Sequence, residues 1–130
     1  MFTLEQILSA HSKIKSGPDF PRFIKEIGEL GVARYETFVK DGHTDYYDSL
    51  ANTISSRPRY SELDISGAPD HDTFRSRLLL HQRGQASYPQ FCSDAASSGV
   101  FKWIVNLAGM TCTYIDALGH IILTEEIPEV

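Results

Sequence analysis

The stretch that decides the fold occurs twice in this chain: as FPRFIKEIGELGVARYETFVKDGHTDYYDSLANTI over residues 20–54 and as YPQFCSDAASSGVFKWIVNLAGMTCTYIDALGHII over residues 88–122. Aligned without a gap at a spacing of 68 positions, the two copies share eight identical residues in 35. Chance would give about two at ordinary residue frequencies. We therefore predict a chain built from two related halves.

Helix signals precede each half of the repeat. Thr3 and Gln6 have the spacing of a capping box, and Gly17-Pro18 would end the helix that they start. Asp19 can cap a second helix, which Gly31 is suited to end. In the second half the same reasoning predicts a helix from Asp72 or Thr73 to Gly84 and another from Pro89 to Gly99.

Strand signals follow each pair of helices. Residues 32–39 are rich in β-branched and aromatic side chains, Asp41-Gly42 is a hairpin turn signal, and residues 44–47 and 52–56 continue as strands. The second half repeats this pattern, with predicted strands over residues 100–107, 111–116 and 121–127. Residues 57–69 form the expected connector, with a short strand near residues 62–65.

These elements predict an α+β fold with an internal duplication. Each half is two helices and a three-stranded antiparallel sheet, over about residues 1–60 and 69–130. A unit of about 65 residues buries too little apolar surface to be stable alone. We therefore expect a single domain over residues 1–130, with a pseudo-twofold axis and a cleft between the two packed halves.

The charge balance and hydropathy exclude several classes of partner. The net charge is −5, from 12 Lys and Arg against 17 Asp and Glu, which argues against a general nucleic-acid binder. No apolar run reaches the ~18 residues that a membrane span requires. The N-terminal residues lack the pattern of a signal peptide, so a cytoplasmic protein is expected.

Sequence motifs indicate neither a metal centre nor a known catalytic site. Cys92 and Cys112 are predicted to be reduced thiols, because there is no export signal and no C-x-x-C motif, and to be buried as small apolar side chains. Their spacing to each other and to His81 or His120 matches no zinc framework. We expect no metal and no cofactor. The motifs of P-loop, Rossmann, hydrolase and metalloprotease sites are all missing.

The segment His81-Gln82-Arg83-Gly84-Gln85 is the first candidate for a functional surface. His81 could act as an acid or base near neutral pH, with Gln82 and Gln85 holding a ligand. The alternative is a helix C-cap, in which His and Arg face the last carbonyl groups and Gly84 adopts a left-handed turn.

Aromatic and acidic residues recur at equivalent strand positions. Tyr114 and Asp116 share one face of a strand and could form an acid–base cleft with their repeat partners, although an aspartate before a turn also binds turn backbone. Trp103 and its equivalent Tyr35 could stack on a planar ligand, or could simply belong to the core.

Much of the second half resembles a small bacterial family. The residues that carry the resemblance are His81–Gln85, Tyr88, Phe91-Cys92, Gly99–Trp103, Met110–Asp116, Gly119 and Glu126–Pro128. On these residues the chain is similar to the YbcV-like family, also labelled phage envelope protein, whose members are uncharacterised. The resemblance implies a fold and a kinship, and it transfers no catalytic residue.

Three functional hypotheses remain open at this point. The first, which we favour, is a binding or accessory module with a small-molecule ligand in the cleft between the halves. The second is a small enzyme with His81, Gln85, Tyr114 and Asp116 as its polar site. The third is an interaction module or homodimer through an edge strand at residues 118–123. The ligand-binding candidates are His81, Gln82, Gln85, Trp103, Tyr114 and Asp116.

Overall fold

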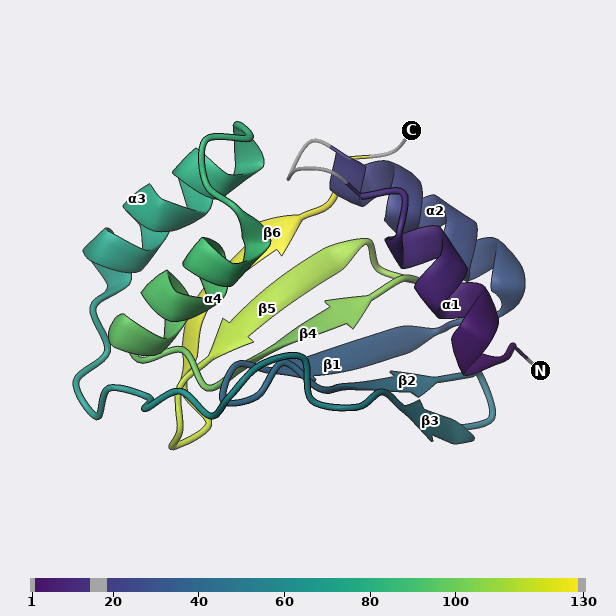
Figure 1. The fold of residues 1–130 in the computed structure, drawn as a ribbon, viewed down its shortest axis with the longest axis horizontal. Helices are drawn as coiled ribbons and strands as arrows, with labels where there is room; N and C mark the ends of the chain where they lie inside the picture. Colours follow the sequence, from purple (N-terminus) through teal and green to yellow (C-terminus); the bar gives the residue numbers. More distant parts are fainter. Residues whose placement is uncertain (1, 15–18, 129–130) are drawn as a thin grey trace.

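The computed structural model describes residues 2–14 and 19–128 and shows an α+β fold, with four helices and a six-stranded antiparallel sheet (Figure 1). The elements are α1 Leu4–His11, α2 Phe20–Leu30, β1 Arg34–Phe38, β2 Thr44–Tyr47, β3 Thr53–Ser55, α3 His71–Gln82, α4 Tyr88–Ser97, β4 Lys102–Asn106, β5 Thr111–Ile115 and β6 Ile121–Glu126. The predicted α+β class and the order of elements in each half are confirmed.

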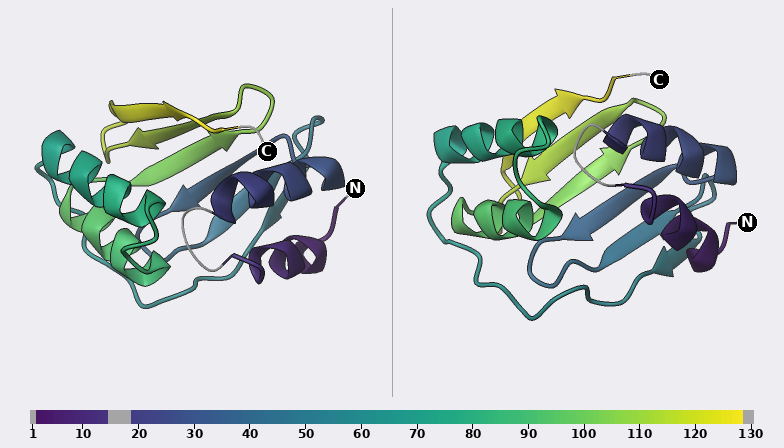
Figure 2. Two further views of the ribbon diagram at one scale, coloured as in Figure 1. Left: turned by 90° about the horizontal axis from the view of Figure 1, so that it is seen from above. Right: turned by 45° about the horizontal axis from the view of Figure 1, so that its top comes forward.

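One sheet runs through the whole molecule in the order β3-β2-β1-β4-β5-β6. The two halves meet at its centre, where β1 pairs antiparallel with β4. All four helices lie on the same face of this sheet, as α1–α2 and α3–α4 pairs (Figure 2). The apolar core therefore lies between one helical layer and one face of the sheet, as expected for a two-layer α+β fold.

Equivalent hydrogen bonds recur at the spacing of 68 residues. Val32 N donates to Ile27 O after α2, and Val100 N donates to Ala95 O after α4. Gly31 ends its helix with a φ of 108°. Its counterpart in the second half, Gly99, has a φ of 86°, so both glycines adopt the left-handed conformation that an L side chain resists.

Strands β1 and β4 pair in a symmetric register: if each residue is replaced by the one 68 positions away in the other half, the pairing stays the same. Leu107 N donates to Ala33 O at one end, and Val39 N donates to Phe101 O at the other. The two bonds correspond, because Val39 lies 68 positions before Leu107 and Phe101 lies 68 positions after Ala33. The register therefore centres on the pair of Glu36 in β1 and Ile104 in β4.

Several predicted details are corrected by the structure. No strand forms near residues 62–65, because the backbone there is bonded elsewhere: Leu63 N donates to Lys40 O and Ser66 N to Ala96 O. The N-cap of α3 is Asp70, whose carboxylate accepts from Thr73 N, and not Asp72 or Thr73. Helix α1 ends at His11, and the predicted stop at residues 17–18 lies outside the described residues.

Candidate functional site

A pocket lies between the two helix pairs and the sheet, with a volume of about 210 Å³. Both halves contribute to it: α1 and α2 supply His11 and Phe23, while α3 and α4 supply Leu78 and Phe91. The C-terminal segment closes one side with Ile127 and Pro128. The pocket is therefore at the internal interface, where the sequence analysis expected a cleft.

The floor of the pocket consists of two cross-strand rows of side chains. One row contains Tyr46 in β2, Tyr35 in β1 and Cys112 in β5. The neighbouring row contains the side chains of Thr44 in β2, Thr37 in β1, Trp103 in β4 and Tyr114 in β5. All seven side chains line the pocket because alternate strand residues share one face.

The helices form the roof of the pocket, and their aromatic side chains touch those of the floor. The Trp103 ring centroid lies 5.5 Å from that of Phe91 in α4 and 6.0 Å from that of Tyr114. The rings of Tyr35 and Tyr46 are 5.5 Å apart, and Tyr35 meets Phe23 of α2 edge-on. A molecule in the pocket would therefore meet both aromatic ring faces and tyrosine hydroxyl groups.

Polar groups are few and have defined places. The hydroxyls of Thr37 and Thr44 are 2.9 Å apart in the buried floor. Arg59, from the connector, places its Nη1 3.0 Å from Nε2 of His11 in α1. At the β6 side, Gln82 Nε2 donates to Glu125 Oε1 over 2.9 Å.

The two histidines of the pocket are held neutral. Burial, with a smaller effect of the nearby Arg59 charge, lowers the pKa of His11 to about 4. Burial also lowers the pKa of His81, against the opposing effect of a hydrogen bond with Ala86 O. Near neutral pH both side chains therefore act as uncharged aromatic rings, and the His81 ring stacks on Phe91 with centroids 4.4 Å apart.

Four of the six predicted ligand-binding residues meet at this pocket: His81, Gln82, Trp103 and Tyr114. Gln85 is exposed and does not line the pocket. Asp116 lies apart from the pocket, in the turn after β5, where its Oδ1 accepts from Leu118 N and His120 N. The structure thus does not bring Asp116 together with His81 and Tyr114.

The turn at Asp116 has a close counterpart in the first half. Asp48 Oδ1 accepts from Leu50 N and Asn52 N over 2.9 Å each. In both turns the aspartate carboxylate accepts hydrogen bonds from the backbone N–H groups two and four residues later. This is the turn-binding alternative that the sequence offered for Asp116. The carboxylates are therefore engaged in turn formation and are unsuited to acid–base work in the pocket.

Sequence reasoning missed His11, Arg59 and Tyr88, which complete the pocket. Arg59 lies in a connector without periodicity, and no local pattern marks its direction. Tyr88 stood next to the predicted helix start at Pro89, and its edge-on contact with His11, with centroids 6.2 Å apart, depends on tertiary packing.

Other kinds of site find no support in the part of the chain that the structure describes. Within residues 2–14 and 19–128, no three His, Cys, Asp or Glu side chains gather as a metal-binding group. None of the helices in the same ranges is both long and apolar enough to cross a membrane. Both cysteines are buried and free, and burial raises the pKa of Cys112 to about 12.

Fold and site together define an α+β protein with a ligand-sized aromatic pocket between its helical layer and its sheet. The chain belongs to the family described as "Protein of unknown function (DUF1398)", whose model matches residues 8–126. It is also similar to "Uncharacterized protein YcgX" of Escherichia coli (strain K12), with 20% identity over 95 residues, 73% of this chain and 71% of that protein. These descriptions assign no activity, which agrees with the unknown function expected from the sequence.

Lowering the pH should destabilise the protein before its carboxylates titrate. The pKa values of His11 and His81 are lower in the folded chain than in the unfolded one. As the pH falls from about 6.5, the unfolded state therefore takes up protons that the folded state does not. For His11 this loss of stability continues down to about pH 4, and above pH 6.5 it vanishes.

Urea unfolding at pH 7 and pH 5 measures this effect. The variant His11→Phe keeps an aromatic ring against Phe23 and Tyr88, and its stability should fall less between the two pH values than that of the wild type. His71→Phe, at an exposed position, is the control and should leave the difference unchanged. If the stability of the wild type and of His11→Phe had the same pH dependence, the lowered pKa of His11 would be contradicted.

Proposed function

We propose that this chain is a binding module for a small, flat, largely apolar molecule that occupies the pocket between the two helix pairs and the sheet. The observation that carries the proposal is the lining: aromatic side chains from both halves surround about 210 Å³ at the internal interface. Apolar pockets with a few convergent polar groups are the usual sites of small ligands. A cavity of this size suits one or two fused rings.

We further infer that the two halves arose by duplication within a single domain over residues 1–130. Support comes from the shared order of elements, the bonds that recur at a spacing of 68 and the matching Asp48 and Asp116 turns. Duplication accounts for the floor of the pocket, because Tyr35 and Tyr46 are equivalent to Trp103 and Tyr114. The YbcV-like kinship, with its phage envelope label, and the cytoplasmic location stay predictions.

A binding function fits the pocket better than the alternative enzyme. The polar site proposed for the enzyme combined His81, Gln85, Tyr114 and Asp116, and in the structure Gln85 and Asp116 lie outside the pocket. Burial raises the pKa of Tyr114, so this hydroxyl stays protonated and serves as a hydrogen-bonding group. A homodimer through residues 118–123 also remains a proposal, independent of the pocket.

Binding can be followed through the single tryptophan, because Trp103 lines the pocket. We expect one- and two-ring aromatic compounds to change its fluorescence and to raise the thermal unfolding midpoint in proportion to their affinity. If a broad panel of such compounds produced neither change, the proposed function would be wrong.

The location of binding is tested by closing the mouth of the pocket. Gln82 is exposed at the rim, so Gln82→Trp should weaken the binding of every active compound without unfolding the chain. Gln85→Trp adds the same side chain three residues away, outside the pocket, and should bind like the wild type. Equal affinities of the two variants would place the ligand elsewhere.

A further inference from the structure

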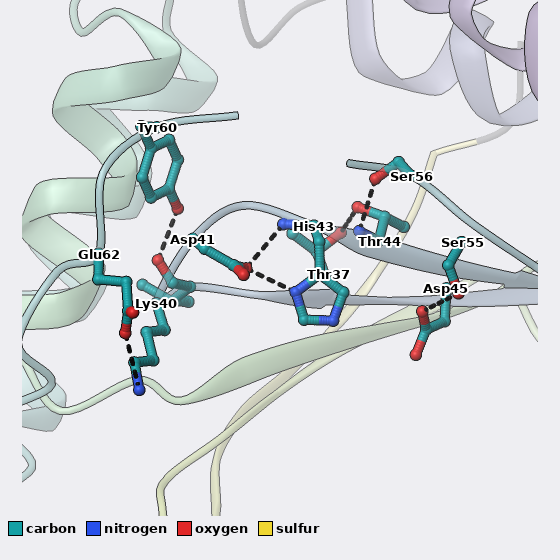
Figure 3. Close-up of polar contacts among 11 residues, drawn as sticks. Thr37, Lys40, Asp41, His43, Thr44, Asp45, Ser55, Ser56, Tyr60 and Glu62 are labelled. Carbon is teal, nitrogen blue, oxygen red and sulfur yellow. Dashed lines mark hydrogen bonds and ion pairs between the residues drawn. The ribbon is translucent and has the colours of Figure 1, made fainter. Parts of the chain in front are cut away.

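Arg59 is held at the pocket by the docking of the connector onto the β1–β2 hairpin. Arg59 N donates to Asp41 O over 2.8 Å, and Leu63 N donates to Lys40 O over 2.7 Å. Between them, Tyr60 Oη donates to Val39 O over 2.6 Å (Figure 3). With the backbone fixed on both sides, the Arg59 side chain extends to the pocket and reaches α1 and α4.

The groups around the Arg59 guanidinium are uncharged near neutral pH. His11 is 3.0 Å away and neutral, and the centre of the Tyr88 ring is 6.0 Å away. Burial raises the pKa values of Tyr46 and Tyr88, so both hydroxyls keep their protons. A half-buried cation among neutral neighbours is costly unless an anion compensates it.

Within residues 2–14 and 19–128, no carboxylate forms an ion pair with Arg59. Some other cations among the described residues do form ion pairs, as Lys40 does with Glu62 over 2.9 Å and Lys102 with Glu36 over 2.8 Å. The nearest contacts of Arg59 are instead with groups that line the pocket. Its five N–H donors are suited to a planar carboxylate in two parallel hydrogen bonds.

We infer that the ligand is an aromatic acid, with a carboxylate or a comparable planar oxyanion paired to Arg59 and its ring between the aromatic side chains of the floor and roof. This inference rests on the proposed function and names the ligand class. The opposite side of the pocket, at β6, carries Glu125, whose carboxylate accepts from Gln82 Nε2. Like-charge repulsion there favours the orientation with the ligand's acid group at Arg59.

The test compares two ligands of nearly equal shape, 2-naphthoate and the neutral 2-naphthamide, by isothermal titration calorimetry at pH 7. Arg59→Gln should weaken 2-naphthoate binding by about tenfold or more, because the variant loses the charged hydrogen bonds to the carboxylate. It should change 2-naphthamide binding by only about twofold, because the Gln side chain can still donate a hydrogen bond to the neutral amide. Arg57→Gln, an exposed neighbour with the same loss of charge, should affect neither ligand.

The outcomes separate this inference from the proposed function. If Arg59→Gln weakened the binding of both ligands equally, or of neither, Arg59 would not recognise an anion. Such a result would leave the proposed binding to the pocket intact. Failure of both ligands to bind the wild type would overturn this inference, whereas the proposed function would be overturned only if the broad panel of aromatic compounds also failed to bind. Arg59→Lys keeps the charge and serves as the second variant if Arg59→Gln does not fold. It should retain only part of the preference for 2-naphthoate over 2-naphthamide. An unchanged preference would contradict bidentate pairing.

Discussion

Replacing Phe74 with alanine should lower the free energy of unfolding by about 3–5 kcal/mol, the range for a large aromatic side chain lost from a core. Phe74 is the only core side chain of α3 with no exposed surface among the described residues. Its ring lies 4.8 Å from that of Tyr114 and 6.0 Å from that of Phe91. It therefore joins the second helix pair to the sheet directly beside the pocket.

The loss at Phe74 should appear in urea unfolding as a lower midpoint with an unchanged slope. Leu79→Ala is the matched control, because Leu79 lies on the same helix with 45% of its surface exposed. It should cost less than about 1 kcal/mol. Because the Phe74 ring contacts Tyr114, which lines the pocket, Phe74→Ala should also weaken ligand binding. Similar losses in the two variants would show that α3 is not anchored through Phe74.

Local signals in the sequence predicted much of this fold. The residues of β2, Thr44–Tyr47, match the predicted range, and Thr3 and Gln6 form the predicted capping box. Gly31 ends α2 as expected. Each of these features depends on side chains within a few positions of one another, so a pattern in the sequence is sufficient to identify it.

The parts that could not be predicted depend on contacts between distant segments. Asp19 stands at the N-cap position of α2 but makes no capping hydrogen bond, although its type and place suit one. Residues 62–65 alternate apolar and polar like a strand, yet Leu63 N donates to Lys40 O of the hairpin, and the following Ser66 N donates to Ala96 O of α4. Arg59 reaches the pocket only because the connector docks on the hairpin. Such competition between local preference and tertiary bonding is invisible in one sequence.

The strongest test of how the connector joins the second half is Gly99→Ala compared with Gly31→Ala. The two glycines lie 68 positions apart, after α2 and α4, and both have positive φ, so each substitution should cost about 1–2 kcal/mol in backbone strain. A Cβ at Gly99 would also lie 2.7 Å from Cα of Pro69, whereas at Gly31 the nearest atom, Cδ1 of Phe2, is 3.9 Å away. Backbone atoms cannot rotate aside, so Gly99→Ala should cost about 1–3 kcal/mol more, the range for overpacking.

The extra cost arises where the connector joins the second half. Asp70 N donates to Ser98 O over 2.9 Å, and the Asp70 carboxylate caps α3, so displacing Pro69 should loosen both contacts. Paired urea unfolding gives the difference in stability, and amide hydrogen exchange should show faster exchange at Thr73 in Gly99→Ala alone. Equal losses of stability in the two variants would mean that Pro69 can move without cost. The connector would then be held by the hairpin contacts around Tyr60, and not by the turn at Gly99.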